Sequence, residues 1–106
     1  MTLTPLSYTL TLIKQLNNLW KVDAIESGHH DYHQLDVVWG RKYLKIRQHY
    51  AHSNGRSVYM FVDKVNGFCY KPASWKSPAK GVRYDIHTLV NSPEICDPYG
   101  SFLYTY

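Results

Sequence analysis

The chain has 106 residues, a length that fits one domain whose core can fold without a metal ion or a disulfide framework. Its composition is 44% hydrophobic and 15% aromatic, with ten Tyr, three Trp and three Phe, and its net charge is +4. No apolar run is long enough to span a membrane and the first residues lack a secretory signal pattern, so we expect a cytoplasmic protein without a membrane partner.

The positive charge is concentrated in the middle of the chain. Residues 41–83 contain ten Lys and Arg and a single acid, Asp63. Residues 1–40 contain two basic and four acidic side chains, and residues 84–106 contain three acids and no Lys or Arg. This asymmetry is typical of a protein with a polyanionic partner. The alternative is a solvated basic face that has no partner.

Residues 5–21 are predicted to form an N-terminal helix. Thr4 can cap it, and Pro5 suits the first helical position, where a missing N–H costs nothing. Apolar side chains recur at steps of three and four residues, which predicts a stripe that faces a core. The residues of this stripe are Leu6, Leu10, Ile13, Leu16 or Asn17, and Trp20.

Residues 22–40 carry a weaker pattern, which we interpret as a loop followed by a short element ending at Gly40. Ser27 and Gly28 mark a break, and the apolar run 35–39 fits either a strand or a helical turn.

Residues 42–71 are predicted to form an antiparallel β-meander of three strands. Apolar side chains alternate with polar or aromatic ones from residue 41 onward, which is the period of a strand. Asn54-Gly55 and Asn66-Gly67 provide the residues that tight turns require. Pro72 cannot donate to a ladder, so the third strand ends there or lies at an edge.

Residues 72–83 are predicted to be a basic loop stiffened by Pro and Gly, and residues 84–106 to contain short elements and a flexible tail. The segment 85–90 could form a helix or a fourth strand, and residues 102–106 a last edge strand. The predicted fold is therefore a single small α+β domain, in which the helix packs on three, four or five antiparallel strands.

The side of the meander away from the helix is the first candidate for function. Tyr43, Lys45, Arg47, Tyr59 and Phe61 are expected to point outward. Rings interleaved with cations can stack bases and neutralise phosphates, as single-stranded nucleic acid requires. The alternative is that Tyr59 and Phe61 are buried in a sheet covered on both faces.

The basic loop is the second candidate. A stiff loop with one Trp and several cations can grip a phosphate backbone, or it can be a structural wrap whose Trp fills the edge of the core. Both interpretations of the loop stay open at this stage.

Other chemistry finds little support in the sequence. His29 and His33 have the i, i+4 spacing of metal ligands, but no further ligand accompanies them, and we expect exposed loop histidines. Cys69 and Cys96 have no C-x-x-C spacing, which favours reduced, partly buried thiols. No coupled nucleophile and base is visible, so we expect no enzymatic activity, metal or cofactor.

Two segments carry a recognisable pattern: KYLKI at 42–46, and FVDKVNGFCYKPASWKSPAKGVR at 61–83. Through them the chain resembles a group of small, uncharacterised proteins encoded by bacteriophages, in which a KYxKI strand precedes an FVD…G…YKxASWKxPAKxxR segment. The resemblance implies a viral accessory or structural protein that acts in the cytoplasm of an infected cell. It implies no activity and no functional residue.

Our leading hypothesis is a viral, non-enzymatic protein that binds nucleic acid, single-stranded rather than duplex, with little sequence specificity. The alternative is a protein-interaction module, either an inhibitor of a host protein or a self-assembling virion component, that uses the Tyr-rich surface and residues 99–106. The residues predicted to contact nucleic acid are Tyr43, Lys45, Arg47, Tyr59, Lys71, Trp75, Lys76, Lys80 and Arg83.

Overall fold

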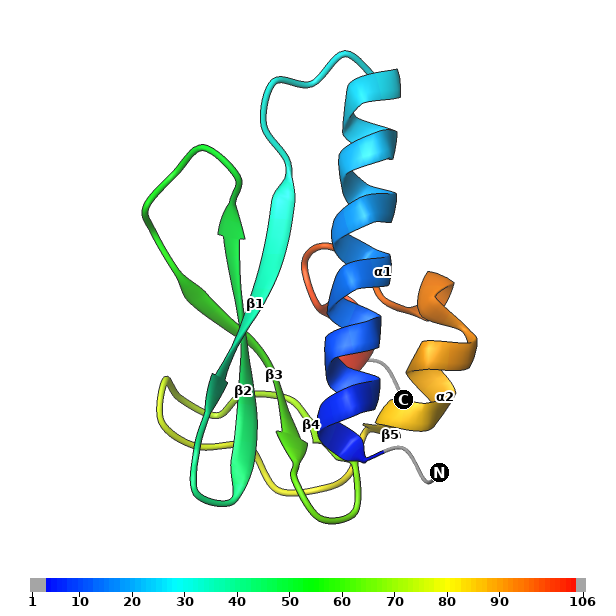
Figure 1. The fold of residues 1–106 in the computed structure, drawn as a ribbon. Coiled ribbons are helices and arrows are strands. Elements are labelled where there is room, and N and C mark those ends of the chain that lie inside the picture. Colours follow the sequence, from blue (N-terminus) through cyan, green and yellow to red (C-terminus); the bar gives the residue numbers. More distant parts are fainter. Residues whose placement is uncertain (1–3, 105–106) are drawn as a thin grey trace.

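The computed structural model describes residues 4–104 and has one long N-terminal helix lying against a five-stranded antiparallel sheet (Figure 1). The predicted α+β fold is thus confirmed, with five strands. The elements follow the order α1 (Pro5–Glu26), β1 (His33–Trp39), β2 (Tyr43–Tyr50), β3 (Ser57–Asp63), β4 (Phe68–Tyr70), β5 (Tyr84–Asp85), α2 (Ile86–Asn91), and the short 3-10 helices η1 (Pro93–Ile95) and η2 (Ser101–Tyr104).

Helix α1 begins where the sequence predicts and ends later. The Thr4 hydroxyl accepts a hydrogen bond from the Ser7 N–H at 3.2 Å, and Pro5 occupies the first turn. The helix continues to Glu26, five residues beyond the predicted end, because nothing before Ser27 interrupts it. Gly28 then adopts a φ of 76°, a left-handed conformation that suits a residue without Cβ.

Strands β1 to β5 lie in sequence order, each antiparallel to the next. Strand β1 is the element that the sequence left undecided, and residues 33–39 pair with β2 along their whole length. The Asn17 side chain fixes α1 to this edge strand, since it donates to the Leu35 carbonyl at 3.0 Å and accepts from the Leu35 N–H at 2.7 Å. A polar residue within the helix thereby satisfies the exposed edge of the sheet.

The hydrophobic core lies between α1 and the inner face of the sheet, which we define as the face toward α1. It includes Leu12 and Leu16 from the helix, and Leu44, Ile46 and Val62 from the strands. Alternation along β2 turns its apolar residues to this side, which is how a period of two builds a half-buried sheet.

The C-terminal part closes the core instead of forming a flexible tail or an edge strand. Phe102 and Leu103 in η2 are buried, and the Phe102 ring contacts the Tyr59 ring with 5.9 Å between centroids. The last edge strand predicted for residues 102–106 is therefore wrong for residues 102–104, which belong to a 3-10 helix; the final two residues lie outside the described part. Residues 86–91 form a helix, one of the two predicted alternatives.

Candidate nucleic-acid interface

The outer face of the sheet, the side away from α1, is aromatic and partly covered. Tyr43 packs edge-on against Phe61 and Tyr70, with centroid distances of 6.0 and 5.8 Å. Phe61 is only 2% exposed, so this ring serves packing and not contact with a partner. The interpretation in which Phe61 is buried is therefore the correct one.

The loop 71–83 lies on the outer side of the sheet, where Figure 1 shows it in yellow. It folds back on itself, since the Ala79 N–H donates to the Lys71 carbonyl at 2.8 Å and the Ala73 N–H donates to the Ser77 carbonyl at 3.0 Å. Trp75 lies in the bend between these hydrogen bonds. The loop is therefore a compact flap that covers part of the sheet and presents a Trp.

The Trp75 side chain is exposed and lies next to a cation. Its side chain is 47% exposed, and the Lys45 ammonium lies 4.7 Å from the centroid of its ring. The contact joins strand β2 to the loop and places a predicted phosphate ligand beside a predicted stacking ring. The structure thus brings these two predicted site residues together.

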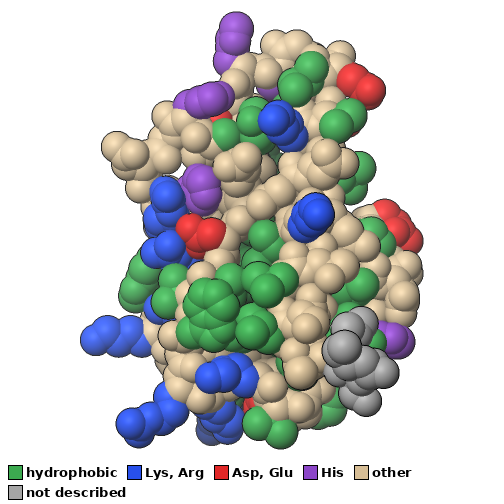
Figure 2. Space-filling view, viewed as in Figure 1, with side chains coloured by type: hydrophobic (Ala, Val, Ile, Leu, Met, Phe, Trp, Pro, Cys, Tyr) green, Lys and Arg blue, Asp and Glu red, His purple; other side chains and the backbone are tan. Residues whose placement is uncertain are grey.

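A groove next to this contact is rich in basic side chains. Its volume is about 360 Å³, and it is lined by four cations together with the rings of Trp39, Tyr43 and Phe61. The space-filling view shows Lys and Arg gathered toward this lower left part of the molecule (Figure 2). The cations are Arg41, Lys42, Lys45 and Lys76. We call this hollow the basic groove.

Gly40 shapes the turn that carries two of these cations. Its N–H donates to the Tyr43 carbonyl at 2.9 Å, and a Cβ at this position would lie 2.6 Å from that carbonyl oxygen. The turn between β1 and β2 can therefore be this tight only with glycine. Trp39 and Arg41 flank this glycine, and both line the groove.

The acids near the outer face are held by other groups. Asp36 forms two hydrogen bonds with the Arg47 guanidinium, at 2.8 and 2.9 Å, and lies 3.6 Å from Arg56. The bond to Asp36 raises the pKa of Arg47. Asp63 is buried and accepts hydrogen bonds from the N–H groups of Val65 and Asn66. Neither carboxylate lines the basic groove within the described residues.

Tyr59 does not belong to this face, which corrects the sequence-based prediction. Arg47 pairs with Val58 and Ile46 pairs with Met60, so Tyr59 is an extra residue in a β-bulge. The bulge turns Tyr59 to the inner face, where it is 3% exposed and donates to the Asp97 carbonyl at 2.7 Å. Burial is the main reason why its pKa is raised. A buried ring cannot stack on a base.

The remaining predicted residues do not line the groove. Arg47 is bound to Asp36, and Lys71 lies 5.0 Å from the centroid of the Tyr104 ring. Lys80 is exposed, while Arg83 is half-buried. Of the nine predicted residues, the groove itself brings together Tyr43, Lys45 and Lys76, with Trp75 beside them.

Three groove residues escaped the sequence analysis: Trp39, Arg41 and Lys42. Trp39 is 59% exposed, although it ends an apolar run that suggests burial. The signal that could have identified them is WGRK at residues 39–42, an aromatic ring and two cations around a glycine at a hairpin end.

The histidines and cysteines fit structural roles better than metal binding or nucleophilic catalysis. Among residues 4–104, no group of three or more His, Cys, Asp or Glu could hold a metal ion. His29 and His30 are exposed, as expected for loop histidines, whereas His33 is half-buried in β1. Cys69 and Cys96 are free and buried, and burial raises the pKa of the Cys96 thiol to about 12. Protonated, buried thiols are poor nucleophiles.

Comparison with known proteins gives a family without an assigned activity. Within the described residues, no helix combines the length and the hydropathy needed to cross a membrane. No curated protein and no solved structure matches the chain. Residues 2–105 match a family of unknown function, DUF7717. Because this match covers nearly the whole chain, the protein belongs to the DUF7717 family.

Proposed function

We propose that the protein is a small viral accessory protein that binds single-stranded nucleic acid without sequence specificity, in the cytoplasm of an infected cell. The observation that carries the nucleic-acid proposal is the basic groove, which combines four cations with three rings and contains no acid among its described lining residues. The viral setting rests on the sequence resemblance alone.

Binding divides into two kinds of contact. Arg41, Lys42 and Lys76 neutralise phosphates, because their side chains are exposed and the two nearby acids are held by other groups. Trp39 and Trp75, 59% and 47% exposed, stack on bases. Stacking accepts any base, so this arrangement gives affinity with little sequence preference.

The rings favour a single strand over a duplex. A base can reach the face of Trp39 or Trp75 only when it is unstacked from its neighbours, which costs little in a single strand. The groove is also small, about 360 Å³, and has no protruding helix that could enter the major groove of a duplex.

Fluorescence anisotropy with a labelled oligothymidylate tests this function. We expect binding that weakens as salt rises, with a log–log slope of about −0.7 for each neutralised phosphate. The double variant Lys42→Ala/Lys76→Ala should bind more weakly and lose about 1.4 from the magnitude of that slope.

The matched control is Lys14→Ala/Lys21→Ala, which removes the same charge from exposed positions on α1. It should keep the wild-type salt slope. Equal losses in both double variants would mean that net charge alone drives binding, and the absence of binding at micromolar protein would refute the proposal.

A second function, protein interaction, is favoured by one separate observation. Leu19, Val22 and Ile25 are all exposed and lie three residues apart on α1. Such a stripe could contact a host protein or a second copy in a virion assembly. Light scattering after size exclusion tests it: a homo-oligomer that persists at high salt and dissociates on Ile25→Glu would favour assembly.

A further inference from the structure

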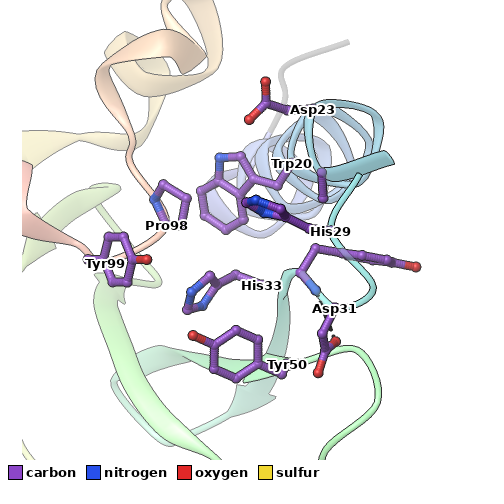
Figure 3. Close-up of a pocket in the computed structure, with 10 residues that line it drawn as sticks. Trp20, Asp23, His29, Asp31, His33, Tyr50, Pro98 and Tyr99 are labelled. Carbon is purple, nitrogen blue, oxygen red and sulfur yellow. Dashed lines mark hydrogen bonds between the residues drawn. The ribbon is translucent and has the colours of Figure 1, made fainter. Parts of the chain in front are cut away.

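A second cavity, with a volume of about 270 Å³, lies where four segments meet. These are the end of α1, the start of β1, the end of β2 and the residues Pro98 and Tyr99 (Figure 3). Its lining residues share none with the basic groove. We call it the ring cavity, because six of its lining side chains carry aromatic rings: Trp20, His29, Tyr32, His33, Tyr50 and Tyr99.

The rings surround a common space. Figure 3 shows the His33 ring between those of Tyr50 and Tyr99, with the rings of Trp20 and His29 across the same space. The His33 ring lies 4.3 Å from the centroid of Tyr50 and 5.0 Å from that of Tyr99. Tyr99 is 74% exposed, so its ring has room to close over a ligand.

The charge around the ring cavity is opposite to that of the basic groove. Asp23 and Asp31 line it, whereas no Lys or Arg is among its described lining residues. The Asp31 carboxylate is fixed by the N–H groups of Tyr32 and His52, at 2.9 and 3.1 Å. In a chain of net charge +4, this is a local site of negative potential.

Burial and a hydrogen bond favour the neutral form of the His33 imidazole. Gln48 Nε2 lies 2.6 Å from His33 Nδ1 and also donates to the Pro98 carbonyl. Since an amide nitrogen only donates, His33 Nδ1 accepts and carries no proton. Burial lowers the pKa of His33, and the attraction of nearby Asp31 opposes this only in part. The same Gln48 amide fixes the segment that carries Tyr99.

We propose that the ring cavity binds a small organic cation of the alkylammonium or guanidinium type. Electron-rich rings attract such a cation through their faces, and the two carboxylates add a longer-range attraction. The volume lies just below the roughly 300–1,000 Å³ typical of small-molecule sites, which suits a ligand of few atoms. This site is independent of the nucleic-acid proposal, because its charge would repel a phosphate.

The geometry also gives the site a pH dependence. The groups that face His33 are Gln48 and Tyr50 from β2, Tyr99 from the C-terminal segment, and Asp31 through its charge. Asp23 and His29 line the same cavity, and His49 and Arg56 line a neighbouring hollow that His33 also borders. A proton on Nδ1 would point at the Gln48 amide hydrogens, and it would place a positive charge beside the bound cation. Binding should therefore weaken as the pH falls through the titration of His33.

Two-dimensional ¹H–¹⁵N NMR of the full chain tests the proposal with three probes at matched ionic strength. Tetramethylammonium chloride and methylguanidinium chloride distinguish the two cation types, and 3,3-dimethylbutan-1-ol is a neutral alkyl control. We expect saturable shifts of the Trp20 indole N–H and of the Tyr99 amide with at least one cation, and none with the alcohol. Affinity should fall as the pH drops below the ordinary range of an imidazole, because burial lowers the pKa of His33.

Tyr99→Ala should weaken binding by about two- to five-fold, the value of one exposed cation–π contact. Its matched control, Tyr104→Ala, removes an exposed tyrosine that does not line the cavity and should keep wild-type affinity. Both positions are exposed, so both variants should fold. Equal shifts with the neutral alcohol, no saturable shift with either cation, or tighter binding at low pH would each overturn the proposal.

Discussion

The two faces of the central sheet are made from the same strands and have opposite roles. On the inner face, Leu44 and Ile46 are fully buried against α1. On the outer face, Tyr43 and Lys45 from the same strand lie under the 71–83 loop and beside the basic groove. Alternation along β2 therefore separates the residues that build the fold from those available to a partner.

The bulge in β3 shows how one residue can change sides. In a strand that alternates strictly, Tyr59 and Phe61 would point to the same face of the sheet. The extra residue lets Tyr59 join the core while Phe61 keeps its place in the outer ring cluster. The sequence pattern places Tyr43, Lys45 and Phe61 on the outer face, but the bulge in β3 moves Tyr59 to the inner face.

The largest difference between the two faces should appear in the free energy of unfolding of variants. Leu44→Ala removes a fully buried side chain and should lower the free energy of unfolding by about 2–5 kcal/mol. Lys45→Ala, at the adjacent position, should lower it by less than about 1 kcal/mol, since it loses one partly exposed contact with Trp75. Urea denaturation of both variants measures the difference. Similar losses would mean that the outer face is also essential for folding.

Tyr59→Phe should have an intermediate effect on stability and leave the affinity for nucleic acid unchanged. The Asp97 carbonyl loses the hydroxyl that donates to it, which should cost about 1–3 kcal/mol. Because Tyr59 lies on the inner face, affinity for oligothymidylate should stay at the wild-type value. Denaturation and anisotropy on the same sample separate the two effects. A loss of affinity without a loss of stability would mean that Tyr59 contacts the nucleic acid.

Asp36→Asn should have the smallest effect on stability, and it should strengthen the binding of nucleic acid. It releases Arg47 and Arg56 and removes a negative charge from the outer side of the sheet. We expect affinity for oligothymidylate to rise a few-fold at low salt, and stability to fall by less than about 1 kcal/mol, as for other exposed ion pairs. Weaker binding by this variant would mean that Asp36 positions Arg47 for the ligand.

Much of the fold could be predicted from the sequence because local signals agree there with the final packing. Thr4 and Pro5 mark the start of α1, and the alternation in 42–50 gives a strand with its correct inner face. The two Asn-Gly pairs correctly locate the connections on either side of β3. In these segments the residues that favour an element locally are also those that pack within it.

The rest depends on contacts between distant segments. Strand β1 lacks a clear period because its half-buried residues face partly covered surfaces, and its edge is satisfied by Asn17 from the helix. The Phe61 ring packs against Tyr43 from the neighbouring strand, and Phe102 reaches Tyr59 across 43 positions of sequence. The groove likewise joins a hairpin end at Gly40 to Lys76, which sequence spacing alone cannot bring together.

The three tryptophans allow the central claim to be tested in one measurement. Trp39 and Trp75 are 59% and 47% exposed beside the basic groove, whereas Trp20 is 7% exposed beside the ring cavity. Indole N–H signals, assigned with Trp→Phe variants, can be followed while oligothymidylate is added. We predict saturable shifts of Trp39 and Trp75, with Trp20 unchanged. Shifts of Trp20 alone, or no shift of any indole at saturating oligonucleotide, would contradict an interface on the outer face of the sheet.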